Sequence, residues 1–125
     1  MKTIINSENA PNPIGPYNQA VKADNFLFIS GQIAIDPKQA KIIAQDIGGQ
    51  TWQVLENLKA ILQTAGYTLN DIVQTNVYLS AMTLFKEFNA EYAKHFQKDY
   101  PARVTVAAEL PANALVEISA VAYKD

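Results

Sequence analysis

The stretch from Asp46 to Ser80, DIGGQTWQVLENLKAILQTAGYTLNDIVQTNVYLS, decides the fold because it predicts a helix followed directly by a strand. Its first part, Asp46–Ala65, has apolar residues at helical spacing along one stripe, made of Trp52, Leu55, Leu58 and Leu62 and widened by Val54 and Ile61. Asp46 is an acidic residue at the helix start, and Gly66 is a typical C-terminal stop. The second part, Ile72–Ser80, is rich in β-branched and aromatic residues, which favours a strand. We expect the whole stripe, including Trp52, to lie in the core.

Further strand-like and helical segments flank this unit on both sides. Before it we predict an edge strand over Met1–Ile5, a proline-rich loop over Asn9–Pro16, a strand over Phe26–Ile35 and a short strand over Lys41–Ile43. After it we predict a second helix over Thr83–Lys98, with Phe85, Phe88, Tyr92 and Phe96 on one face, and strands over Arg103–Glu109 and Leu115–Lys124. This order mixes hairpins with crossovers. It predicts a single α+β domain over residues 1–125, with a mixed β-sheet and both helices packed on one face.

The composition restricts the class of protein. The 125 residues suit one domain, and 49% hydrophobic residues can form a core. The formal net charge of -2, without a run of like charges, argues against a dedicated nucleic-acid binder. The chain has no cysteine and one histidine, His95, which excludes disulfides, a thiol nucleophile and thiolate-rich or histidine-rich metal sites. We expect a soluble cytoplasmic protein, since no apolar run approaches a membrane span and no leader-like segment opens the chain.

Alternation along the predicted strands divides the sheet into two unlike faces. One face is purely aliphatic and is expected to carry the helices: Leu27, Ile29, Ile33, Val73, Val77, Leu79, Val104, Val106, Val116 and Ile118. The other mixes aromatic and polar side chains: Phe26, Phe28, Ser30, Gln32, Gln74, Asn76, Tyr78, Arg103, Thr105, Glu117 and Ser119. This mixture is typical of a surface that meets a partner, most economically a second copy of the chain. The alternative is an ordinary half-exposed sheet face.

Arg103 and Glu117 are the side chains most suited to chemistry. Arg103 is the only arginine among ten cationic residues, and a guanidinium suits two-point recognition of a carboxylate or phosphate. Glu117 stands between Val116 and Ile118, where a carboxylate needs a partner or a function to offset its desolvation. If their strands pair as a hairpin, both side chains lie on one face. They then form either a plain structural ion pair or an anion clamp beside a general base.

Six blocks in order along the chain carry a resemblance to a known family. They are Ile14–Val21 (IGPYNQAV), Phe28–Ile33 (FISGQI), Gln50–Lys59 (QTWQVLENLK), Thr75–Leu79 (TNVYL), Phe85–Tyr92 (FKEFNAEY), and the closing group Pro101–Arg103, Leu110–Pro111 and Val116–Ile118. The first block is similar to the IGPYSQAV opening of the RidA/YjgF family, and the others resemble that family's later blocks. Together they span nearly the full length of the chain.

The resemblance implies an enamine/imine deaminase that forms a homotrimer of chorismate-mutase-like fold, with clefts between subunits. Such enzymes hydrolyse 2-aminoacrylate, 2-aminocrotonate and their 2-imino tautomers, released by pyridoxal-phosphate dehydratases, to 2-keto acids and ammonia. By resemblance, Arg103 holds the substrate carboxylate and Glu117 activates water. Five further residues match positions that line the family's pocket: Tyr17, Ser30, Gly31, Asn89 and Thr105. Neither a metal nor an organic cofactor is implied.

The chain departs from the family pattern at several positions. Asn18 replaces a serine, Thr105 stands where many members have a cysteine, and Ser119 replaces a glutamate two residues after Glu117. The segment Arg103–Leu110 is one residue shorter than the family pattern, and such a loss within a strand reverses the faces of the residues after it. Two other functions therefore stay open. One is a trimer that binds small 2-keto or 2-imino acids without turnover, and the other is an RNA-directed role, which the net charge argues against.

Overall fold

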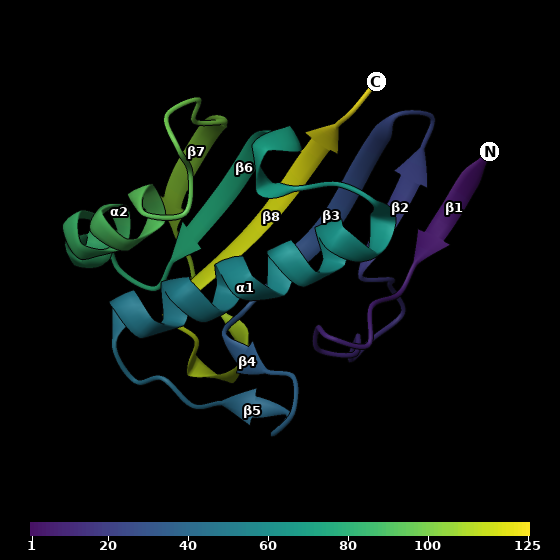
Figure 1. Cartoon of the computed structure of the whole chain (residues 1–125). Coiled ribbons are helices and arrows are strands. Elements are labelled where there is room, and N and C mark those ends of the chain that lie inside the picture. The colour runs from purple at the N-terminus through teal and green to yellow at the C-terminus, as the bar shows by residue number, and fades with distance from the viewer.

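The computed structural model describes residues 1–125, and it places two α-helices on one face of a six-stranded sheet (Figure 1). The sheet strands are β1 (Lys2–Ile5), β2 (Ala20–Ala23), β3 (Phe26–Gln32), β6 (Ile72–Leu79), β7 (Ala102–Ala107) and β8 (Val116–Tyr123). The helices are α1 (Ile47–Ala65) and α2 (Phe85–Ala93), and β4 (Ile35–Asp36) pairs with β5 (Lys41–Ile42) in a separate ribbon. Short 3₁₀ turns lie at Leu69–Asp71, Met82–Leu84 and Pro111–Asn113. The predicted mixed sheet with both helices on one face is confirmed.

The strand order is β1-β2-β3-β8-β6-β7. Every neighbouring pair in this sheet is antiparallel except β6 and β7. Those two are parallel because α2 connects them as a crossover, which returns the chain to the same end of the sheet. The C-terminal strand β8 is inserted between β3 and β6, so the strands that carry Arg103 and Glu117 are not neighbours. The predicted hairpin between them is wrong.

Helix α1 begins and ends where the sequence predicts. Asp46 caps it by accepting a hydrogen bond from the Gly49 N–H at 3.2 Å, and Gly66 ends it with a left-handed φ of 86°. Leu55, Leu58 and Leu62 are fully buried against the sheet, together with Val54 and Ile61. The expectation for Trp52 is wrong, because its side chain is 49% exposed. Trp52 lies about 120° around the helix from Leu58, at the edge of the stripe.

The second helix is shorter than predicted, since α2 ends at Ala93. Its aromatic face is nevertheless largely buried: Phe88 and Tyr92 are in the core, Phe96 packs beyond the helix end, and Phe85 at its start is 37% exposed. The Tyr92 and Phe96 rings have their centroids 4.8 Å apart. None of the helices is long and apolar enough to cross a membrane.

The predicted faces hold for β8 and for most of β3 and β6, but they are reversed on β7. Because β7 pairs in parallel with β6, Arg103 lies beside the buried Thr75 and Thr105 lies beside the buried Val77. Both side chains therefore face the helices. Val104 and Val106, which the alternation placed in the core, are on the opposite face and are 53% and 43% exposed.

Two irregularities in strand pairing explain the other residues whose predicted face is wrong. A register shift on β6 between Ile72 and Gln74 leaves Val73 46% exposed instead of buried. A second shift on β3 between Ile29 and Gln32 moves Gln32 into register with Ile118, so that Gln32 is buried. A one-residue shift exchanges the faces of the residues beyond it, and alternation alone does not detect it.

The short segment after Arg103 leaves β7 intact. Pairing with β6 runs without a shift from Ala102 to Ala107, and the Ala108 N–H then donates to the Leu79 carbonyl at 2.9 Å. A regular strand over Ala102–Ala107 therefore sets the position of Arg103.

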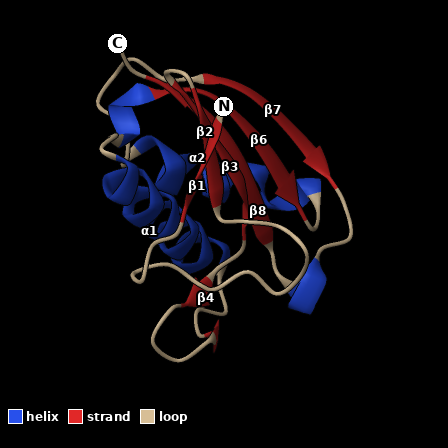
Figure 2. Ribbon diagram, turned by 90° about the vertical axis from the view of Figure 1, so that its right-hand side faces the viewer, coloured by secondary structure: helices blue, strands red, loops and turns tan.

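The face of the sheet opposite the helices is left uncovered by them (Figure 2). It carries the exposed side chains of Phe26, Phe28, Val104, Val106 and Tyr123. We call this surface the open face. Alternation places Glu117 on it, since its cross-strand partner Tyr78 lies between the buried Val77 and Leu79.

The left-handed backbone at Gly66 generates a stability prediction. A Cβ at Gly66 meets no atom within 4 Å, so Gly66→Ala tests backbone strain alone and is expected to lower the free energy of unfolding by about 1 kcal/mol. Gly48→Ala, in the first turn of α1, is the matched control and is expected to leave stability unchanged or raise it. Urea denaturation followed by circular dichroism measures both variants. Equal stability of the two would contradict the prediction.

Candidate functional site

Arg103 is an unpaired cation held by aromatic rings. Its guanidinium carbon lies 5.7, 5.4 and 4.9 Å from the ring centroids of Phe85, Phe88 and Tyr92, all of them on α2. Such contacts stabilise a cation and restrict its orientation without neutralising it. The only ion pairs in the chain join Glu91 to Lys94 and His95, so no carboxylate lies within 4.0 Å of Arg103. Its positive charge is therefore free to meet a ligand.

Tyr92 also fixes this arrangement through its hydroxyl. That hydroxyl hydrogen-bonds the Thr75 hydroxyl of β6 at 2.8 Å, which ties α2 to the strand beside β7. Burial raises the pKa of Tyr92 above its usual value, although the Thr75 hydrogen bond and the charge of Arg103 partly oppose the shift. The phenol therefore stays neutral and presents a ring face, not a counter-ion, to Arg103.

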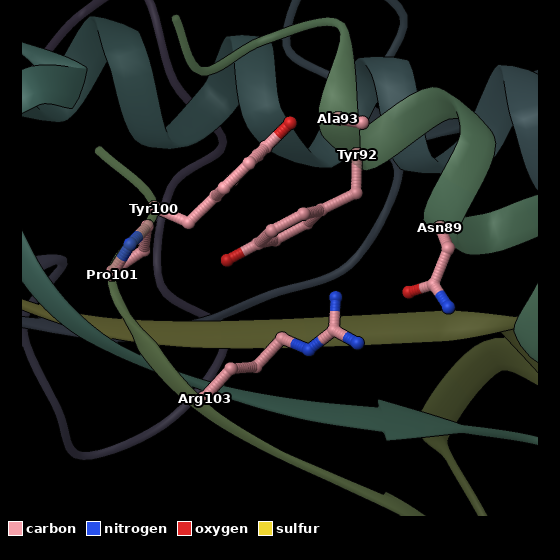
Figure 3. Close-up of a pocket in the computed structure, with 6 residues that line it drawn as sticks. All are labelled: Asn89, Tyr92, Ala93, Tyr100, Pro101 and Arg103. Carbon is pink, nitrogen blue, oxygen red and sulfur yellow. The ribbon is translucent and has the colours of Figure 1, made fainter. Parts of the chain in front are cut away.

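A cavity of about 300 Å³ lies beside the guanidinium, lined by Asn89, Tyr92, Ala93, Tyr100, Pro101 and Arg103. Figure 3 shows Asn89 reaching into this space from α2 and Arg103 reaching into it from β7. Asn89 Oδ1 is buried without a hydrogen-bond partner, and so is Oγ1 of Thr105, two residues beyond Arg103. We call Asn89, Arg103 and Thr105 the arginine half-site. It combines an unpaired cation with two polar atoms that the chain leaves unsatisfied.

A second group of predicted residues gathers at the irregularity in β3. Ser30 and Gly31 lie within the register shift, where β3 has one residue more than β8. The Ser30 hydroxyl donates to the Asn18 carbonyl at 2.6 Å, which fixes the side chain against the segment that follows Tyr17. A Cβ at Gly31 would collide with the carboxylate of Glu117 and would lie only 3.0 Å from its Cδ. Gly31 thus leaves room for this position of the Glu117 carboxylate, the flexible end of a side chain that a Cβ would displace.

Glu117 is the unpaired anion that completes this group. Its carboxylate makes no ion pair, and burial raises its pKa above the usual value for a glutamate. A carboxyl group whose pKa is raised is a stronger base than an ordinary carboxylate, which suits it to accept a proton and return it. We call Tyr17, Ser30, Gly31 and Glu117 the glutamate half-site.

Tyr17 is at the surface, 47% exposed, at the end of the proline-rich loop. Its hydroxyl accepts a hydrogen bond from the Ile14 N–H at 3.4 Å. The loop itself is held by Gln19, a buried residue that the sequence analysis did not single out. The Gln19 side chain accepts from the Ser7 N–H at 2.6 Å and donates to the carbonyl of Pro11 at 2.9 Å. Gln19 therefore positions the loop that leads into the glutamate half-site.

The two half-sites lie on opposite faces of one sheet. Arg103 points toward α2, whereas Glu117 lies on the open face, and β6 separates their strands. The chain therefore does not form the direct Arg103–Glu117 ion pair that one reading of the sequence predicted. It also contains no cluster of three or more His, Cys, Asp or Glu side chains that could bind a metal ion.

Comparison with known proteins identifies the family. A family model described as "Endoribonuclease L-PSP" matches residues 7–124. A "RutC family protein" of Pyrococcus horikoshii is 56% identical over 100% of both chains. "Reactive Intermediate Deaminase A, chloroplastic" of Arabidopsis thaliana is 39% identical over 97% of this chain and 65% of its own length. The chain belongs to the RidA/YjgF family.

Solved structures of the RidA/YjgF family share this fold. The chain matches the structure of E. coli TdcF with bound serine with a TM-score of 0.92 and 36% identity, over 98% and 99% of the two chains. It matches the YjgF gene product of E. coli with a TM-score of 0.91 and 38% identity, again over 98% and 99%. The RidA/YjgF family includes proteins named as deaminases and proteins named as endoribonucleases.

The aromatic contacts of Arg103 were not predicted from the sequence. Phe88 and Tyr92 were assigned to the core by their helical spacing, which is correct. Their second role depends on the parallel pairing of β6 and β7, which brings Arg103 beneath α2. A strand-helix-strand order over residues 72–107 was the available signal, since such units pair their strands in parallel.

The raised pKa of Glu117 predicts a pH-dependent effect on stability. A carboxyl group whose pKa is raised by folding favours the folded state when protonated, and that contribution is lost as the pH rises through the folded-state pKa. Glu117→Gln, which cannot ionise, is therefore expected to be more stable than the natural chain at pH 7. The difference is expected to shrink toward pH 4. Thermal denaturation between pH 4 and pH 8 measures it, and a difference independent of pH would contradict the prediction.

Proposed function

We propose that this protein hydrolyses small 2-imino acids and their 2-enamine tautomers, such as 2-iminobutanoate and 2-iminopropanoate, to 2-keto acids and ammonia. The observation that carries the proposal is the arginine half-site, in which an unpaired guanidinium lines a cavity together with Asn89, whose amide oxygen is unsatisfied. A planar cation of this kind suits the two oxygens of a carboxylate. The name of the deaminase relative and the bound serine of TdcF, a small carboxylate ligand, support the same reading.

Glu117 is the proposed acid-base group. It takes a proton from a water molecule while the oxygen attacks C2 and the π electrons of the C=N bond move onto the nitrogen, and it passes that proton to the nitrogen to give a carbinolamine. Glu117 then takes the proton of the C2 hydroxyl and gives it to the nitrogen as the C=O bond forms, the C–N bond breaks, and ammonia leaves. The imine plus one water gives the keto acid plus ammonia, so no redox or organic cofactor is needed. The raised pKa of Glu117 suits both transfers.

The proposed catalytic cleft lies between two copies of the chain. Arg103 and Glu117 are on opposite faces of the sheet, so one copy does not bring them to the same substrate. The open face carries exposed rings of Phe26, Phe28 and Tyr123, a surface expected to be covered in an assembly. We propose a homotrimer in which the arginine half-site of one copy faces the glutamate half-site of the next. Ser30, Gly31 and Tyr17 then line the same cleft as Asn89 and Thr105.

A coupled assay tests the activity. A threonine dehydratase generates 2-aminocrotonate in a buffer that slows its spontaneous decay, and the appearance of 2-ketobutanoate is followed with and without this protein. The protein is expected to accelerate that step. Arg103→Lys keeps the charge but loses the planar fork, so kcat/KM is expected to fall about 10- to 100-fold. Near-normal turnover in Arg103→Lys would contradict the proposed role of Arg103 in holding the substrate carboxylate.

A mixing experiment tests whether the cleft is shared. Arg103→Ala and Glu117→Gln are each expected to be inactive alone. Equal amounts of the two variants are unfolded and refolded together. If each site takes Arg103 from one copy and Glu117 from the next, half of the sites have the natural Arg103, and half of those also have the natural Glu117. The mixture is then expected to regain about one quarter of the normal activity. A site within one copy would regain none. Refolded mixtures of each variant with itself are the controls, and their oligomeric state is checked by gel filtration.

The other two functions predict different results in these assays. A carboxylate-binding trimer without catalysis would bind 2-ketobutanoate and fail to accelerate its formation. An RNA-directed role, suggested by the endoribonuclease names of some relatives, would give RNA binding that falls steeply with salt. The net charge of -2 does not favour that outcome.

A further inference from the structure

The unsatisfied atoms of the arginine half-site differ in what they can bind. The Thr105 hydroxyl can rotate to donate or accept, so it can serve many ligands. The amide oxygen of Asn89 can only accept, and it is buried without a donor in the chain. A buried acceptor without a partner costs free energy, so its presence in a ligand cavity indicates a ligand that brings an N–H or O–H group.

The neighbouring Arg103 imposes the opposite requirement. A guanidinium has only donors, and it selects an anionic acceptor. Figure 3 shows the Asn89 amide and the guanidinium facing the same space from the helix and the strand. Both line the cavity of about 300 Å³. The ligand that satisfies both groups therefore carries a carboxylate and an N–H close to it.

The proposed substrate and product differ in this respect. A 2-imino acid or its enamine tautomer has a carboxylate on C2 and an N–H on the same carbon. The 2-keto acid product keeps the carboxylate, but its C2 carries a carbonyl oxygen, which is an acceptor only. That oxygen placed against Asn89 Oδ1 would set two acceptors against each other.

We propose that Asn89 Oδ1 accepts a hydrogen bond from the substrate nitrogen and thereby makes the site prefer the 2-imino acid to the 2-keto acid. Hydrolysis removes the donor, so the contact is lost when the product forms, and release of the keto acid is favoured. The identity of the substrate in this inference rests on the proposed function. The preference for a ligand with both a carboxylate and an N–H group rests on the cavity itself.

Two stable ligands of matched size test the preference. Oxamate and pyruvate share a carboxylate and a carbonyl on the next carbon, but oxamate has an NH₂ where pyruvate has a methyl group. Isothermal titration calorimetry on the natural protein is expected to give oxamate an affinity about five- to tenfold higher than pyruvate, the effect of one hydrogen bond. Asn89→Leu is expected to bring the ratio of the oxamate and pyruvate affinities to about one, because only oxamate loses a hydrogen bond, and the retained Arg103 clamp keeps the binding of both ligands measurable.

The control variants separate this role from a structural one. Asn89→Ala, at a helix position that favours alanine, repeats the test if the leucine packs poorly. Asn70→Leu makes the same substitution at an exposed amide outside the cavity and is expected to keep the preference for oxamate. Circular dichroism and gel filtration confirm that each variant is folded and assembled.

Three outcomes would overturn the inference. They are equal affinities for oxamate and pyruvate in the natural protein, an equal loss of affinity for both ligands in the Asn89 variants, and no binding of either ligand. The last would also remove the carboxylate clamp from the proposed function. A preference for oxamate that depends on Asn89, together with no acceleration in the coupled assay, would remove the deaminase activity and leave the ligand preference standing. Failure of the two proposals can thus be told apart.

Discussion

Strand β8 pairs with β3 on one side and β6 on the other, and it is the only strand that joins the N-terminal half of the sheet to the β6–β7 pair. Its alternation is strict: Val116, Ile118, Ala120 and Ala122 are buried beneath the helices. The residues between them must then lie on the open face. The core packing of β8 thus sets the position of Glu117, and the surrounding sheet supplies the burial that raises its pKa.

The crossover through α2 has a corresponding effect on Arg103. Because α2 returns the chain in parallel beside β6, the side chain of Arg103 lies under the rings of α2 and not on the open face. No carboxylate of the chain lies within 4.0 Å of Arg103, which leaves its charge available. The two groups most suited to the proposed reaction are therefore held on opposite faces by ordinary sheet geometry. Under our proposal, assembly of copies and formation of the cleft are one event.

Several parts of this structure were predictable from local sequence. The α1 boundaries follow from Asp46 and Gly66, and the buried stripe between them has the expected spacing. The errors about the faces of the strands share one cause, which is that alternation assumes regular pairing with an assumed neighbour. One-residue shifts at Val73 and within Ser30–Gln32 break the alternation, and the register of β7 places Val104 beside Asn76, on the open face. The resemblance to the RidA/YjgF family identified Asn89 as a pocket residue, and periodicity could not have done so.

The sequence by itself determined the fold class, the length and caps of α1, the family, and the choice of Arg103 and Glu117 as the charged residues most suited to chemistry. These depend on spacing, residue type and motif order, which are local properties of the chain. Only the tertiary structure decided which strands are neighbours, which face Arg103 occupies, and that Asn89 Oδ1 and Thr105 Oγ1 are left without partners. The physical reason is that face, burial and hydrogen-bond satisfaction depend on segments far apart in the chain. A single insertion or a parallel pairing changes them without altering any local pattern.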